Sequence, residues 1–218
     1  MQKLTIDAAG VHVIAPTPFD ETGALDLAST ARMVERYLEA GATGLTILGI
    51  MGEAPKLTGA ESRIFVKEVL ARAGGKIVVT VGVSSPGFAA MSDLTKAVMD
   101  MGASGVMIAP AANLRTDDQI VGYFRQAVEA IGADVPFVLQ DYPLTFSVQM
   151  TPAAPCAITS CVSARMAAKP GAETPTTTGS PLARRIIWRA AAMLSWCSSL
   201  GASPSWPSTV MPVAPHCR

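Results

Sequence analysis

Cysteine and tryptophan are absent from the first 150 residues of this 218-residue chain, and the four cysteines beyond them form no Cys-x-x-Cys pair. Cys156, Cys161, Cys197 and Cys217 therefore lack the paired spacing of zinc and redox sites, and only His216 stands near them. Formal net charge is zero, and no basic stripe indicates a nucleic-acid-binding surface. No apolar run approaches the roughly 20 residues that span a bilayer. We therefore expect no metal, no cofactor, no nucleic acid and no membrane among its partners.

Two further absences narrow the class of protein. Met1 to Gly10 contains no signal-peptide core, so we expect a cytoplasmic setting. No Gly-x-Gly-x-x-Gly turn follows any apolar run, which argues against a dinucleotide-binding sheet. Half of the residues are apolar, and the length is enough for one well-buried core.

Short β-branched runs recur at nearly even intervals of roughly 30 residues, about the length of one βα repeat. Each is followed by a polar turn and then by a stretch of helical period. The runs are Val11 to Ile14, Leu45 to Leu48, Ile77 to Val83, Gly105 to Ile108 and Phe137 to Leu139. This pattern predicts parallel βα units and favours an α/β fold of the (β/α)8 TIM barrel type, which carries its chemistry on the loops after the strands.

The ends of the predicted helices are also readable. Thr58 with Glu61, and Thr116 with Gln119, have the spacing in which a threonine caps the first turn and the residue three positions later reaches back. After Thr58 the apolar side chains of Ile64, Phe65, Val69 and Leu70 are expected on one buried face. Four glycines are expected to end helices: Gly41, Gly74, Gly102 and Gly132.

The amino-acid composition of the chain changes near residue 152. Residues 1–150 hold 16 of the 17 acidic residues, whereas all four cysteines, all three tryptophans and only Glu173 among the acids come later. A second domain, a cysteine-based module and a disturbed coding frame are the competing explanations, and the last is the most economical. We divide the chain into 1–152, the βα-repeat part of the barrel, and 153–218, a divergent tail that either supplies the remaining strands or is disordered.

The loop after the second predicted strand is specific. Gly49-Ile50-Met51-Gly52-Glu53 resembles the Gly-x-x-Gly-Glu signature of the dihydrodipicolinate synthase and N-acetylneuraminate lyase family. Other strand ends resemble that family in the same order, over residues 10 to about 152. They are Ala15 to Phe19, Val81 to Val83, Ile108 to Pro110 and Gln140 to Pro143. The resemblance implies a class I aldolase on a (β/α)8 barrel, without a cofactor. We expect the barrel of this chain to be incomplete or truncated at its carboxyl-terminal end.

The resemblance also implies site residues. In the family a lysine on the sixth strand forms a Schiff base with pyruvate or another 2-keto acid, and Lys169, at the end of Ala164 to Lys169, is the matching candidate. A chance lysine in a shifted frame is the competing interpretation. Tyr142 is the candidate proton-relay phenol, displaced by two positions from its place in the family pattern; the alternative is that this phenol is absent. Gly49, Ile50, Met51, Gly52 and Gln140 are the candidate substrate-binding residues.

Departures from the family pattern bear on the substrate. Hydroxyl residues of the loop are replaced by Ile50 and Met51, a tyrosine pair after the fourth strand by Ala111 and Ala112, and an arginine after the fifth strand by Thr145. These changes argue against lysine biosynthesis and favour a 2-keto sugar acid or another 2-keto acid. The predicted function is therefore a Schiff-base lyase, an aldolase or dehydratase, working as a homo-oligomer. The alternative is an inactive, truncated relative that at most binds a keto acid or a partner subunit.

Overall fold

The computed structural model describes residues 3–5, 8–159 and 187–189. Its core is a six-stranded parallel sheet in which each strand pairs with the next one along the chain. The strands are β1 (His12–Ile14), β2 (Gly44–Ile47), β3 (Val78–Gly82), β4 (Gly105–Ile108), β5 (Phe137–Asp141) and β6 (Ile187–Arg189). Consecutive parallel order with helical crossovers is the arrangement of a (β/α)8 barrel, so the fold class predicted from the sequence is confirmed.

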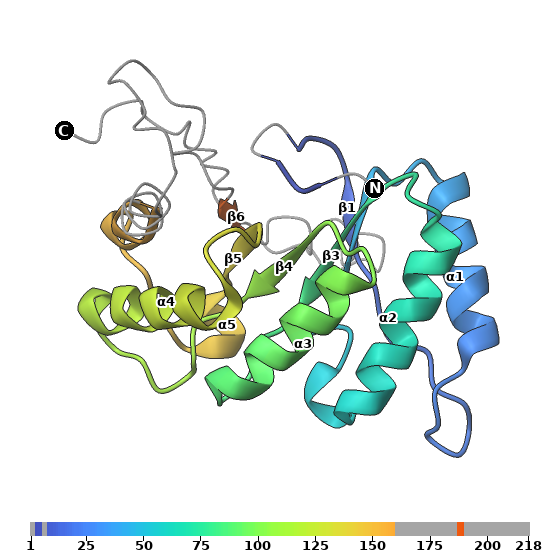
Figure 1. Cartoon of the computed structure of the whole chain (residues 1–218), viewed down its shortest axis with the longest axis horizontal. Coiled ribbons are helices and arrows are strands. Elements are labelled where there is room, and N and C mark those ends of the chain that lie inside the picture. The colour runs from blue at the N-terminus through green and yellow to red at the C-terminus, as the bar shows by residue number, and fades with distance from the viewer. Residues whose placement is uncertain (1–2, 6–7, 160–186, 190–218) are drawn as a thin grey trace, which may run out of the picture.

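The helices follow the strands in strict alternation and lie side by side along the sheet (Figure 1). They are α1 (Leu27–Glu39), α2 (Gly59–Ala73), α3 (Phe88–Asp100), α4 (Asp117–Ile131) and α5 (Pro143–Phe146), with a short 3₁₀ turn, η1 (Ala54–Lys56), before α2. Each of the four long helices packs against its neighbour in sequence. The five strands that the sequence predicts are all present and all parallel.

Helix starts agree with the capping prediction, with one difference. Thr58 accepts a hydrogen bond from the Glu61 N–H at 3.2 Å, and the Glu61 carboxylate accepts from the Thr58 N–H at 2.8 Å, which completes the reciprocal cap. Thr116 likewise accepts from the Gln119 N–H. The Gln119 amide oxygen, however, reaches one residue further back and accepts from the Arg115 N–H at 2.7 Å.

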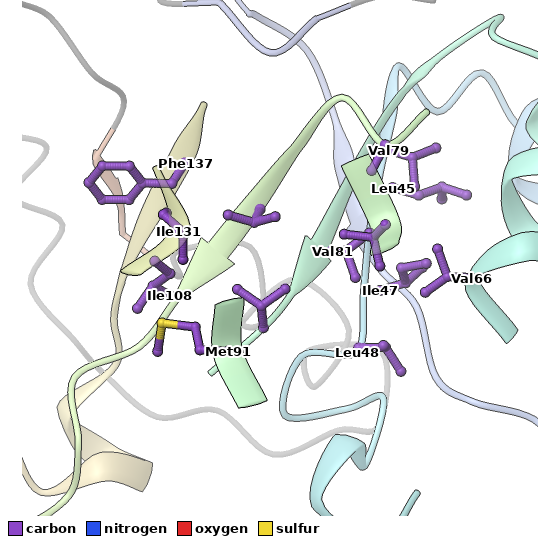
Figure 2. Close-up of a cluster of buried hydrophobic side chains, with 14 of the residues drawn as sticks. Leu45, Ile47, Leu48, Val66, Val79, Val81, Met91, Ile108, Ile131 and Phe137 are labelled. Atoms are coloured by element: carbon purple, nitrogen blue, oxygen red, sulfur yellow. The ribbon is translucent and has the colours of Figure 1, made fainter. Parts of the chain in front are cut away.

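The main core lies between the sheet and the helices. Alternate residues of each strand face it because side chains along a strand point to opposite faces. Figure 2 shows part of this layer, with Leu45 and Ile47 of β2 beside Val66 of α2. The prediction that Ile64 faces the core is wrong, because Ile64 is 49% exposed. Phe65 and Val69 are buried as predicted, and Val66 joins them on the buried face of α2.

A smaller apolar cluster occupies the other face of the sheet, which is the barrel interior. It consists of Leu4, Val78, Met107 and Val138. Leu4 comes from the amino-terminal segment, where its N–H donates to the Ser104 carbonyl at 2.9 Å. That segment therefore crosses the amino end of β4 and contributes a side chain to the interior.

The chain after residue 150 begins as part of the same packing. The Thr151 N–H donates to a carboxylate oxygen of Asp117 at 3.2 Å, residues 153–159 are helical, and Ile158 is buried in the main core. The division at residue 152 stays a prediction. The strand that pairs with β5 is Ile187–Arg189, whereas residues 164–169, predicted to be the lysine-bearing strand, lie outside the described residues.

Candidate functional site

The loops that leave the carboxyl ends of β1 to β5 meet at one edge of the sheet, because all these strands are parallel. We call this edge the carboxyl rim and define it by residues 15–18, 48–53, 83–85, 109–112 and 140–142. Barrel enzymes place their chemistry at this end of the strands. The rim brings together the sequence-predicted loop Gly49 to Glu53, Gln140 and Tyr142, each at or directly after the end of its strand.

The loop from Leu48 to Glu53 is a tight turn whose first and last residues have left-handed backbone conformations. Leu48, buried, has a φ of 53° and Glu53 a φ of 50°, a conformation that residues with a side chain adopt only at some cost. Within the loop the Gly52 N–H donates to the Gly49 carbonyl, and the Glu53 N–H donates to the Ile50 carbonyl, both at 3.1 Å. The turn is therefore closed by its own backbone.

Some N–H groups of this turn are left over, among them those of the successive residues Ile50 and Met51. Among the described residues, the backbone N–H groups of Ile50 and Met51 donate to no protein acceptor. Gly49 and Gly52, which flank them, are buried, and the side chains of Ile50 and Met51 are only partly exposed. Successive free N–H groups in a tight turn form a concave donor site suited to a carboxylate.

The glycines of the rim are required by close packing. A β-carbon at Gly52 would lie 2.9 Å from the Leu48 nitrogen, and one at Gly49 would lie 3.2 Å from the Met107 methyl group of β4. The tightest approach is at Gly82, the last residue of β3, where a β-carbon would lie 2.1 Å from the Leu48 carbonyl oxygen. The loop after β2 thus rests directly on the end of β3.

Hydrogen bonds connect neighbouring loops around the rim. The buried Thr17 hydroxyl, after β1, donates to the Gly52 carbonyl at 2.7 Å. The Ser84 hydroxyl, after β3, accepts from the Ala109 N–H, after β4, at 2.9 Å. These ties hold the loops in fixed relative positions, which a site that orients a small substrate needs.

The end of β5 carries the predicted polar residues. Gln140 lies two positions after Val138, which belongs to the interior cluster, so its side chain falls on the interior face of the sheet. Tyr142 is half-buried, and its carbonyl accepts from the N–H groups of Thr145 and Phe146, both at 3.2 Å, at the start of α5. Gln140 and Tyr142 therefore reach the rim from the same strand end.

Charged side chains near the rim are engaged locally. Lys56 pairs with the Glu53 carboxylate at the end of the loop. The Arg115 guanidinium folds back on its own loop and donates to the carbonyls of Ala112 and Leu114, at 2.7 and 2.8 Å. The described residues contain no group of three His, Cys, Asp or Glu side chains placed to hold a metal ion.

Some rim contacts are not predictable from the sequence pattern. Thr17 and Gly52 are 35 positions apart, and nothing local marks Thr17 as a loop anchor beyond its place between Pro16 and Pro18 at a strand end. The candidate Lys169 lies outside the described residues. No helix in the described part of the chain has the length and apolar character needed to cross a membrane.

Comparison with known proteins agrees with this geometry. The model of the dihydrodipicolinate synthetase family matches residues 7–171. Among solved structures, a dihydrodipicolinate synthase from Rhodopseudomonas palustris is 55% identical with a TM-score of 0.71, over 73% of this chain and 53% of that one. The structure described as PhdJ bound to a substrate intermediate is 27% identical, with a TM-score of 0.66, over 74% of this chain and 52% of its own.

Curated relatives give the same family at lower identity. The 4-hydroxy-tetrahydrodipicolinate synthase of Thiobacillus denitrificans is 29% identical over 137 residues, which are 62% of this chain and 46% of the relative. The 4-hydroxy-tetrahydrodipicolinate synthase 1 of Streptomyces coelicolor is 32% identical over 128 residues, which are 58% of this chain and 41% of the relative. The chain thus spans about half the length of the relatives it matches.

Proposed function

Since the chain belongs to the dihydrodipicolinate synthetase family, we propose that it is a Schiff-base-forming lyase for pyruvate or another 2-keto acid, 2-keto sugar acids included. The reaction would be an aldol cleavage or condensation, or a dehydration. The observation that carries the proposal is the rim loop with its two successive free N–H groups at Ile50 and Met51. A 2-keto acid presents a carboxylate next to its keto group, which fits such a donor pair.

The proposed chemistry assigns the nucleophile to Lys169. Its neutral amine attacks the keto carbon. The keto oxygen takes one proton from the amine and a second from solvent through Tyr142 and leaves as water, so that a protonated imine results. Loss of a proton from the adjacent carbon gives an enamine, which forms a carbon–carbon bond with a second carbonyl compound; water then hydrolyses the imine. The protonated imine accepts the electron pair at the key step, so the enzyme needs no further electron sink. Tyr142 is the proposed proton relay.

The rim supports a particular range of substrates. Ile50, Met51, Ala111 and Ala112 carry no hydroxyl group, and Thr145 stands where the family pattern has an arginine. A product with a second carboxylate would lack the cation that holds it. We therefore place the substrate among 2-keto acids whose far end is uncharged, and not among the precursors of a dicarboxylate.

A second candidate function is keto-acid binding without turnover. One observation favours it: the strand that pairs with β5 is Ile187–Arg189, and this segment contains no lysine. Binding needs the loop of Gly49 to Glu53, whereas turnover needs the lysine as well. Homo-oligomeric assembly and a cytoplasmic setting stay predictions for either candidate.

Reduction of the imine with borohydride distinguishes the catalytic function from keto-acid binding without turnover. Treatment of the full chain with pyruvate and borohydride, followed by intact-protein mass measurement, should give a single stable adduct if an imine forms. Calorimetry with pyruvate in the absence of borohydride should show binding in either case. Binding without an adduct would identify the non-catalytic relative, and neither binding nor adduct would reject both functions.

A further inference from the structure

Ser84 is a residue of the carboxyl rim that the proposed chemistry does not yet use. It follows Gly82, the last residue of β3, by two positions, and its hydroxyl oxygen accepts a hydrogen bond from the Ala109 N–H, after β4, at 2.9 Å. One position earlier the two chains still pair through their backbones, because the Val83 N–H donates to the Met107 carbonyl at 3.0 Å. The Ser84 side chain therefore joins β3 to β4 at the point where their backbone pairing ends.

The hydroxyl proton of Ser84 is available to a ligand. A serine hydroxyl can donate one hydrogen bond while its oxygen accepts others. The oxygen is held by the Ala109 N–H, and within the described part of the chain the hydroxyl donates to no acceptor. Ser84 is also exposed at the rim. Thr17 differs in this respect, because its buried hydroxyl already donates to the Gly52 carbonyl.

Ser84 follows closely on the place where the loop with the free N–H groups of Ile50 and Met51 contacts β3. A β-carbon at Gly82 would lie 3.3 Å from the Gly49 nitrogen, directly before Ile50. Two strand residues, roughly 7 Å, separate Gly82 from Ser84. A 2-keto acid of about five carbons can therefore span from these N–H groups to the Ser84 hydroxyl, with a hydrogen bond of about 3 Å at each end.

The surroundings of Ser84 favour a single polar contact. Ala111 and Ala112, which follow β4, carry only methyl side chains. The neighbouring Ser85 belongs to the turn before α3, where its oxygen accepts from the N–H of the N-cap residue Gly87 at 3.4 Å. An anchored hydroxyl beside methyl groups suits a ligand with one oxygen atom at that point and an apolar end beyond it.

We propose that Ser84 binds the oxygen atom that aldol chemistry places on the fourth carbon of a 2-keto acid. This inference rests on the proposed lyase function and adds a substrate contact to it. In the condensation, the electron pair of the enamine forms the carbon–carbon bond to an aldehyde. The carbonyl electron pair moves onto the aldehyde oxygen, which takes a proton through Tyr142 and becomes the 4-hydroxyl group. Ser84 donates a hydrogen bond to this oxygen and stabilises its developing charge.

Calorimetry tests the contact with two acids that differ by one hydroxyl group, 4-hydroxy-2-oxopentanoate and 2-oxopentanoate. The full chain carries Lys169→Met, which prevents turnover during the titration. Pyruvate has no fourth carbon, so its binding tests the proposed function separately. Ser84→Ala removes the donor and Ser84→Thr retains it. Ser85→Ala is the matched control, because it removes the neighbouring hydroxyl, and circular dichroism first compares the folding of all variants.

We expect the hydroxylated acid to bind at least about fivefold more tightly than 2-oxopentanoate, the effect of one neutral hydrogen bond. The preference should disappear in Ser84→Ala and persist in Ser84→Thr and Ser85→Ala, while all four proteins bind pyruvate equally. Equal affinity for the two acids, or a preference that survives Ser84→Ala, would overturn the inference and leave the proposed function standing. Loss of pyruvate binding in Ser84→Ala alone would overturn it too, because the serine would then only hold the rim together. Absence of pyruvate binding in every protein would overturn both.

Discussion

The carbonyl oxygen of Leu48 rests on the α-carbon of Gly82, so closely that a β-carbon there would lie 2.1 Å away. Leu48 reaches this position through its left-handed backbone conformation, with a φ of 53°. The contact joins the loop after β2 to the last residue of β3. The free N–H groups of Ile50 and Met51 follow directly, so their position depends on this contact.

Gly82→Ala should displace the loop or the end of β3. We expect a loss of about 1–3 kcal/mol in the free energy of unfolding, the usual cost of forcing extra volume into a packed site. Urea denaturation measures it. Gly122→Ala is the matched control, because no atom lies within 4 Å of a β-carbon at that helical position. It should stabilise the protein by about 0.5–1 kcal/mol. Equal effects of the two substitutions would contradict the contact.

Thr17→Val should loosen the rim. The substitution preserves the shape of the side chain but removes the donor to the buried Gly52 carbonyl, which lies 2.7 Å from the Thr17 hydroxyl. Leaving a buried acceptor unpaired costs about 1–3 kcal/mol. Thr17→Ser retains the hydroxyl and should recover most of this stability in the same denaturation assay. A Val variant as stable as the Ser variant would show that the hydrogen bond contributes nothing.

Thr58→Ala should weaken the start of α2. It removes the side-chain oxygen that accepts from the Glu61 N–H at 3.2 Å. Loss of a threonine cap costs about 0.5–2 kcal/mol. Thr58→Ser should stay close to the parent protein in thermal and urea unfolding. The prediction fails if alanine and serine at this position unfold at the same midpoint.

His12 should make stability depend on pH. Burial lowers the pKa of this histidine below 6.5, because the half-buried ring is poorly solvated when charged. As pH falls through 6.5, the unfolded chain takes up a proton before the folded protein does, so the free energy of unfolding decreases until the folded pKa is reached.

The measurement is the urea midpoint of the parent protein and of His12→Asn between about pH 7 and pH 5. The parent should lose stability faster than the variant across this range. Carboxylates with lowered pKa, such as Asp26 and Glu61, lose their stabilising charge in more acidic solution and affect both proteins alike. Parallel curves for the two proteins would exclude His12 as the source of the pH dependence.

Local signals predict most of this fold. The β-branched runs and the Thr58 cap depend on neighbours within a few positions, and they are found where the sequence indicates them. The apolar stripe predicted for α2 includes Ile64, which is on the exposed side of the helix, and omits Val66, which is fully buried. Val66 comes three positions before Val69 and seven before Ala73, the spacing of one helix face, so the periodicity itself favours Val66 over Ile64.

The rim is predictable in part. Gly49 to Glu53 can be found from its motif, and parallel strands place it at the same edge of the sheet as Tyr142. The left-handed conformation of Leu48 cannot be found in this way, since leucine rarely adopts it without tertiary contacts. The tie from Thr17 to Gly52 is equally hidden, because a contact between residues 35 positions apart leaves no periodic pattern.

The central claim is that an imine forms between a 2-keto acid and Lys169. Its most direct test is peptide mass mapping of the full chain after borohydride reduction in the presence of pyruvate, with Lys169→Met and Lys67→Met treated in parallel. We predict one reduced adduct on the peptide that contains Lys169, present in Lys67→Met and absent in Lys169→Met. An adduct on another lysine, or none on a folded protein that binds pyruvate, would contradict the claim.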